Sequence, residues 1–96
     1  MLEFHLMKSV TTFPGFFLNV QFEEGFNKVY DVKPLMESDE EFAVFKQHSE
    51  LFGTASIDMD GCAVTWDGGP TLYCTEIYDN GQTADTPFDA LKIIGL

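Results

Sequence analysis

The chain has 96 residues, with 16 acidic residues against five lysines and no arginine, so its formal net charge is −11. Binding to nucleic acid or to anionic lipid depends on Lys and Arg that neutralise phosphates, so this balance argues against both classes of partner. A chain of this length can bury one hydrophobic core, and we therefore expect a single domain over 1–96.

The sequence shows no sign of export or of metal binding. No run reaches the ~20 apolar residues that a membrane helix needs, and the first residues lack the basic and apolar stretches of a signal peptide. Cys62 and Cys74 have neither a metal-ligand spacing nor the number typical of a disulfide framework. We expect a cytoplasmic protein with reduced cysteines, no metal and no cofactor.

Apolar residues that alternate with polar ones predict the first strands. Leu2, Phe4 and Leu6 alternate with polar neighbours and indicate a strand over about 2–8. Thr11 to Gly15 then connects this strand to the next one.

The segments 16–22 and 26–32 predict a hairpin. A three-residue loop, Glu23-Glu24-Gly25 with Gly25 left-handed, places Leu18 opposite Tyr30. A two-residue loop would turn the apolar face of the first strand toward polar residues. The three-residue loop is therefore expected.

A capping box predicts the next helix. Ser38 followed by Glu41 allows the serine hydroxyl and the glutamate to satisfy free amides of the first turn, which indicates a helix over about 39–47. Phe42 and Phe45 then share its buried face.

Asp60-Gly61 predicts a second hairpin, 54–59 with 62–66, through a two-residue turn. Met59 would then oppose Cys62 and Ile57 would oppose Val64. The same stretch imitates a calcium loop, but a hairpin explains its residues more simply, because Ser begins the loop and Asp replaces the bidentate Glu.

The elements of the C-terminal third are predicted from the glycine and proline residues that interrupt regular structure and from residues that cap helices. Asp67-Gly68-Gly69-Pro70 forms a loop, and a short helix over about 74–80 ends at Gly81, which we expect to be left-handed. The arm 82–96 is either a helix over about 87–94 that begins at Thr86-Pro87, or a segment that packs on a partner. The fold class is therefore α+β, with antiparallel hairpins and short helices.

A core over about 16–81 carries an ordered set of short motifs, each with an acidic, glycine or aromatic residue at a turn or strand end. They are Phe22-Glu23-Glu24-Gly25, Val29-Tyr30-Asp31-Val32, Pro34-Leu35-Met36 ahead of Phe42, Leu51-Phe52, Ile57 to Trp66 across the Asp-Gly turn, and Glu76-Ile77-Tyr78-Asp79-Asn80-Gly81. In this order the chain resembles the family named domain of unknown function 2442, small bacterial and phage-borne α+β proteins. The resemblance implies a partner encoded by a neighbouring gene, in a toxin-antitoxin-like pair, and no established activity.

No catalytic motif is present, and a chain without arginine has little with which to hold an anionic substrate, so we expect no enzyme. We expect a protein-interaction module whose acidic charge favours a basic partner. The interaction candidates are Asp31, Trp66, Tyr73, Tyr78, Phe88 and Leu91. For Asp31 a local turn-capping role is favoured, and for Trp66 a place in the core.

Two further expectations concern ligands and self-association. The alternative function is a small-molecule or metal-ion binding domain that uses surface carboxylates, namely Asp31, Asp58, Asp60 and Asp67. The apolar residues from Phe88 to Leu96 exceed what a free tail exposes, which favours a homodimer.

Overall fold

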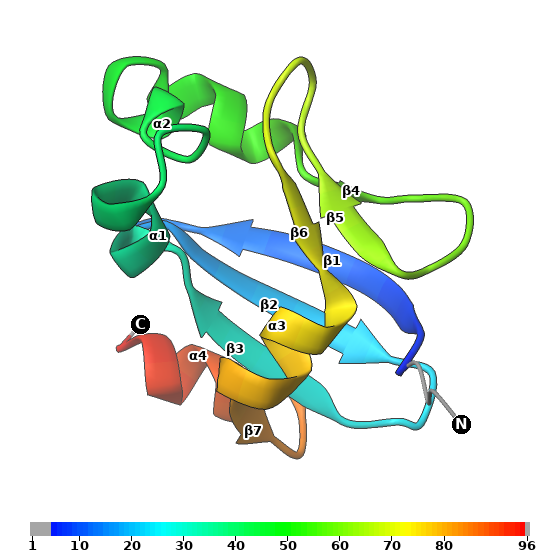
Figure 1. Ribbon diagram of the computed structural model, residues 1–96. Helices are drawn as coiled ribbons and strands as arrows, with labels where there is room; N and C mark the ends of the chain where they lie inside the picture. The colour runs from blue at the N-terminus through cyan, green and yellow to red at the C-terminus, as the bar shows by residue number, and fades with distance from the viewer. Residues whose placement is uncertain (1–4, 96) are drawn as a thin grey trace.

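The computed structural model describes residues 5–95 and contains two antiparallel sheets with short helices (Figure 1). The first sheet has the strand order β1 (Met7–Phe13), β2 (Phe17–Phe22), β3 (Asn27–Asp31) and β7 (Gln82–Ala84), and the second has the order β4 (Ser56–Ile57), β5 (Ala63–Thr65) and β6 (Thr71–Tyr73). The helices are α1 (Lys33–Ser38), α2 (Val44–Gln47), the 3-10 helix η1 (Ser49–Thr54), α3 (Cys74–Asn80) and α4 (Pro87–Ile94). The predicted α+β class is confirmed. Over the described residues, no helix is long and apolar enough to cross a membrane.

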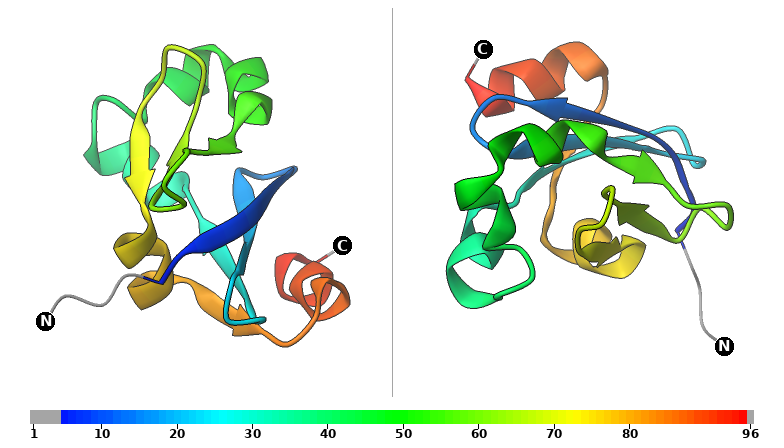
Figure 2. Two further views of the ribbon diagram at one scale, coloured as in Figure 1. Left: turned by 90° about the vertical axis from the view of Figure 1, so that its right-hand side faces the viewer. Right: turned by 90° about the horizontal axis from the view of Figure 1, so that it is seen from above.

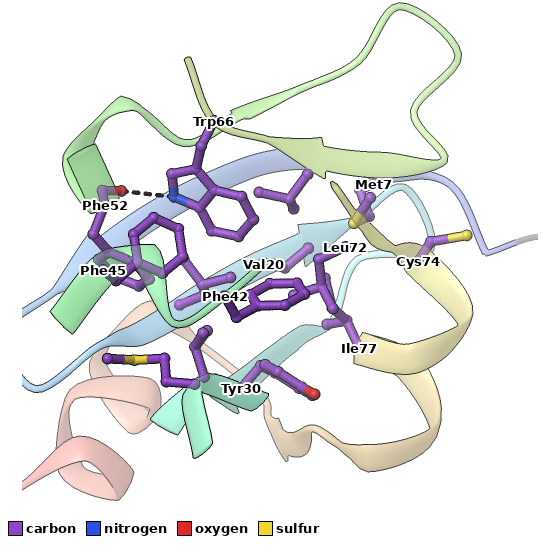
Figure 3. Packing of buried hydrophobic residues seen from close by; sticks show 14 of the residues in the cluster. Met7, Val20, Tyr30, Phe42, Phe45, Phe52, Trp66, Leu72, Cys74 and Ile77 are labelled. Carbon is purple, nitrogen blue, oxygen red and sulfur yellow. Dashed lines mark hydrogen bonds between the residues drawn. The ribbon is translucent and has the colours of Figure 1, made fainter. Parts of the chain in front are cut away.

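The first sheet is covered on both faces. The second sheet and the other helices lie over one face, whereas α4 lies against the opposite face (Figures 1 and 2). Because side chains alternate along a strand, Leu18, Val20 and Phe22 of β2 point into the main core and are fully buried. Between the two sheets, Trp66 packs on three phenylalanines and donates its indole N–H to the Phe52 carbonyl at 2.9 Å (Figure 3).

The first predicted hairpin is confirmed in its register and in its loop. Leu18 pairs with Tyr30, and Gly25 has φ +102°. The loop closes through hydrogen bonds from the Gly25 amide to the Phe22 carbonyl and from the Phe22 amide to the Phe26 carbonyl, both 2.9 Å.

The strand predicted over 2–8 is wrong in its bounds, because β1 runs from Met7 to Phe13; Leu2 and Phe4 lie outside the described residues. β1 pairs with β2 through a tight turn in which Gly15 and Phe16 have positive φ, so the predicted connection Thr11–Gly15 is mostly strand. The alternating pattern around Leu6 does not extend to Thr11–Phe13. These residues form a strand because they pair with β2 directly after the turn.

The helix predicted over 39–47 is wrong in its bounds, because only its last four residues are helical, as α2. Ser38 is the last residue of α1, and its hydroxyl donates to the Pro34 carbonyl at 3.1 Å, so the predicted capping box does not form. Asp39 instead accepts the Glu41 amide at 2.9 Å and starts the turn that leads into α2. Phe42 and Phe45 are buried as expected.

The second hairpin keeps its predicted register but not its predicted turn. Ile57 pairs with Val64, and the Asp58 amide donates to the Ala63 carbonyl at 3.0 Å. The predicted pair of Met59 with Cys62 is wrong, because 59–62 form a four-residue loop. Asp60 does not adopt the positive φ that a two-residue type I′ turn requires. Instead, the Asp58 carboxylate accepts a hydrogen bond from the Cys62 amide at 3.0 Å.

The helix predicted over 74–80 is α3, but its end differs from the prediction. Gly81 has φ −78° and ψ 157°, an extended conformation that any residue adopts, so the left-handed cap is wrong. The chain leaves the helix directly into β7, which pairs with β3. Neither β6 nor β7 was predicted, because three-residue strands have no readable alternation.

The arm 82–96 contributes a strand and a helix to the described fold. The predicted helix over 87–94 is α4, and Ala90 packs with Val29 and Ala84 in a small core on the far face of the first sheet. The Thr86 hydroxyl accepts the Asp89 amide at 3.1 Å, which caps the first turn.

Removing this cap tests how much it contributes to the stability of the fold. The substitution Thr86→Ala leaves an amide of the first turn unsatisfied, so we expect the free energy of unfolding to fall by about 1 kcal/mol. Thr86→Ser keeps a hydroxyl in the same place and should lower the free energy of unfolding by only a few tenths of this loss of about 1 kcal/mol. Urea unfolding of the two variants measures the difference; equal loss in both would show that the hydroxyl does not cap the helix.

Candidate functional site

The loop between β4 and β5 is held rigidly at the end of the second sheet. The Gly61 amide donates to the Asp58 carbonyl at 3.1 Å, and Gly61 has φ +75°. The Gly61 carbonyl in turn accepts the Met7 amide at 2.8 Å, which ties the loop to the start of β1. A side chain at position 61 would lie 3.2 Å from the Met7 carbonyl oxygen, so glycine is required by both conformation and space.

Beside this loop is a hollow of about 500 Å³. Its apolar lining includes Leu6, which is 40 % exposed, and Met59, which is fully exposed. Three acidic residues, Glu23, Asp58 and Asp60, also line the hollow, and Lys8 is the single cation in the lining. We name Leu6, Glu23, Asp58, Met59 and Asp60 the loop surface.

The loop surface combines two kinds of contact. Methionine is flexible and polarizable, so it adapts to an apolar side chain of a partner. The surrounding carboxylates attract Lys or Arg and repel acidic surfaces. Residue types in this arrangement suit a partner segment that presents an apolar side chain next to a basic one.

A second hollow, of about 300 Å³, lies beside α3 and is lined by Phe26, Lys28, Tyr78 and Thr83. The His5 ring stacks on Tyr78 at 3.6 Å, and its Nδ1 lies 2.5 Å from the Glu24 carboxylate. These contacts fasten the chain before β1 to α3.

Next to this hollow, hydrogen bonds join α3 to the first sheet. The Tyr30 hydroxyl and the Asn80 amide both donate to Oε2 of Glu76, at 2.8 and 2.9 Å. Burial of the phenol, followed by its bond to the Glu76 carboxylate, raises the pKa of Tyr30 far above its usual value of 10. The phenol therefore stays protonated at neutral pH and serves as a structural donor.

Among the described residues, the cysteines and histidines do not form a pair of nucleophile and base. Burial raises the pKa of the Cys74 thiol, and the neighbouring Cys62 adds to this, so Cys74 carries little thiolate. His48 lies between α2 and η1 beside Glu50, whereas His5 is held by Tyr78 and Glu24. Neither histidine forms a hydrogen bond with a cysteine among the described residues.

The four carboxylates of the alternative function do not form one site, although Asp58 and Asp60 line the same hollow. Asp31 ends β3 next to α1, at the opposite end of the molecule from the loop of Asp58 and Asp60 (Figure 1). Within residues 5–95, no group of three or more His, Cys, Asp or Glu gathers in a way that could hold a metal ion.

Of the six predicted interaction residues, Asp31 and Trp66 have structural roles in the described fold. Asp31 accepts the Lys33 amide at 3.0 Å and pairs with the Lys33 ammonium at 2.9 Å, which is the favoured capping role. Trp66 is 5 % exposed and belongs to the main core.

The other four candidates lie on different parts of the surface. Tyr73 is 63 % exposed on the outer face of the second sheet, whereas Phe88 is 65 % exposed on α4, in the opposite layer (Figure 2). Tyr78 stacks on His5, and Leu91 of α4 is half-buried. The four residues therefore do not form one interface.

Sequence reasoning named Asp58 and Asp60 as surface carboxylates but missed the apolar part of the loop surface. Met59 was placed in a strand pair with Cys62, which would bury part of its side chain, and Leu6 was placed in a strand. The useful signal is a large apolar residue directly before Asp-Gly, since a wider loop leaves that residue in solvent.

Comparisons with family models, with curated proteins and with solved structures found no match to this chain. The resemblance to the family named domain of unknown function 2442 stays a prediction.

Proposed function

We propose that this protein is a non-catalytic protein-binding module that holds a basic partner against the loop surface. In line with the resemblance, the proposed partner is a small protein encoded by an adjacent gene, and the chain has the antitoxin-like role in the pair. The single observation that carries the proposal is the fully exposed Met59 among three carboxylates.

Three physical arguments support this reading. A side chain as apolar as Met59 gains about 1.5–3 kcal/mol when a partner buries it. The net charge of −11 speeds the approach of a basic protein and repels acidic ones. The loop that carries Met59 is tied at Asp58 and Gly61, so little conformational entropy is lost on binding.

The test is co-expression with the product of the neighbouring gene, followed by co-purification at moderate salt and titration calorimetry. We expect a complex whose affinity falls as salt rises. Met59→Ser should weaken it roughly 10- to 100-fold, which corresponds to the lost burial. Asp60→Lys should weaken it further and reduce the salt dependence.

Phe88→Ser is the matched control, because Phe88 is also a large, exposed apolar residue but lies in the opposite layer. It should leave the affinity unchanged. The absence of any complex with a monodisperse free protein would refute the proposed function, and loss of binding in the Phe88 variant alone would move the interface to α4.

A further inference from the structure

β1 is the open edge of the first sheet and differs in composition from the rest of the chain. It has seven residues, and within 5–95 it is the longest strand and pairs with β2 alone. No charged residue occurs between Lys8 and Glu23, in a chain of which 22 % is charged. The edge is rich in β-branched residues, from Val10 to Thr12, which favour strand pairing.

The ladder shows which backbone groups of β1 are free. Because the Phe22 amide bonds to β3, the residues of β2 that bond to β1 are Gln21, Asn19 and Phe17. The paired residues of β1 are Ser9, Thr11 and Phe13, whose backbone groups point toward β2. The N–H and C=O groups of Val10 and Thr12, which lie between them, therefore point away from the sheet. Over the described residues, no backbone group bonds to these four.

The two ends of β1 are protected, and β4 lies near the strand without pairing with it, so the outward backbone groups between the ends stay unpaired. At the start, the Met7 amide bonds to Gly61, and a bulge with Lys8 follows. At the other end, Pro14 ends the strand. Charges, bulges and prolines are the devices that stop edge strands from pairing, and the stretch from Ser9 to Phe13 has none of them.

We propose that a second copy of this chain pairs along β1. The two strands run antiparallel across a two-fold axis at Thr11, so that Val10 exchanges both backbone hydrogen bonds with the partner's Thr12, and Thr12 with the partner's Val10. All four free groups are satisfied by this one arrangement. The two four-stranded sheets become one continuous sheet of eight strands.

Charge sets the strength of the dimer. Two chains with a net charge of −11 repel each other, and β1 lets them meet without opposing carboxylates, since neither it nor β2 carries one. A strand-edge contact is small among protein interfaces, so the dimer is weak and concentration-dependent. Salt screens the repulsion between the two chains and therefore strengthens the dimer, whereas salt is expected to weaken the complex with the basic partner.

The experiment is sedimentation velocity of the full chain over a range of concentrations at low and high salt. We expect a monomer–dimer equilibrium that shifts toward dimer as salt rises. Thr12→Pro removes an outward amide that the fold itself does not use, and it should abolish the dimer. Thr11→Glu places two like charges at the axis and should weaken the dimer at least tenfold at low salt.

Gln21→Glu is the matched control, because it adds the same charge to the same face one strand further in. It should dimerise nearly as the original chain does, and circular dichroism checks that every variant is folded. A chain that stays monomeric at high concentration and high salt would overturn the proposal, as would a dimer that persists in both β1 variants. Neither result bears on the loop surface, because the variants used there are different.

Discussion

Replacing Gly81 with alanine is expected to lower the free energy of unfolding by about 2–4 kcal/mol. The backbone conformation of Gly81 suits alanine, so the cost arises from space. A Cβ at position 81 would lie 2.5 Å from the Ile77 carbonyl oxygen and 3.2 Å from Cβ of Lys28.

This overlap is not easily relieved. The Ile77 oxygen accepts the Gly81 amide at 2.8 Å and ends α3, while the next residue, Gln82, pairs with Val29 to begin β7. A shift that makes room for the methyl group therefore disturbs a helix end and a strand pair together, because packed interiors transmit such strain.

Urea unfolding followed by circular dichroism measures the effect, with Gly53→Ala as the matched control. Apart from its own chain neighbours and the backbone of its helix, no atom lies within 4 Å of a Cβ at position 53. The control should stay within about 0.5 kcal/mol of the original protein or gain slightly, because alanine restricts the unfolded chain. Similar losses in both variants would show that close approach is not what position 81 requires.

Trp66→Ala is expected to cost about 3–5 kcal/mol, the largest effect of any substitution considered. The indole packs at centroid distances of 5.1 to 6.1 Å against the rings of Phe42, Phe45 and Phe52. Its removal leaves a cavity between the two layers. It also takes the 2.9 Å donor from the buried Phe52 carbonyl, which keeps only the longer 3.4 Å bond from the Ala55 amide.

Trp66→Phe separates these two contributions, since it keeps most of the ring volume but loses the N–H donor. We expect it to cost about half as much as the alanine variant. Tyr73→Ala is the control from the neighbouring strand and should change stability by less than about 1 kcal/mol, because that ring is largely exposed. A neutral Trp66→Ala variant would mean that the second sheet does not depend on this contact.

The elements predicted correctly are those whose signal is local. The hairpin from Phe16 to Val32 combines strict alternation with a glycine that must adopt positive φ, so pattern and turn agree. The start of α4 is similarly indicated by a cap at Thr86, a proline and an acidic residue. Two other local predictions failed, the capping box at Ser38 and the two-residue turn at Asp60-Gly61. Ser38 instead ends α1, and the Asp58 carboxylate closes a wider loop.

For the site, the sequence indicated the class of surface but not its place. Six interaction candidates were chosen for residue type, and two of them, Asp31 and Trp66, serve the fold itself. The loop surface depends on how far Met59 protrudes, which is set by a bond between the Asp58 side chain and an amide four residues later. A period-2 pattern does not carry that information.

The sequence by itself determined the charge, the α+β class and the elements with their own caps and turns, because these depend on residues within a few positions of each other. The tertiary structure alone decided that β7 joins β3, that Gly81 is needed for space, and that β1 is an open edge. Each of these depends on segments distant in the chain, and short strands are stabilised by the partner they meet more than by their own residues.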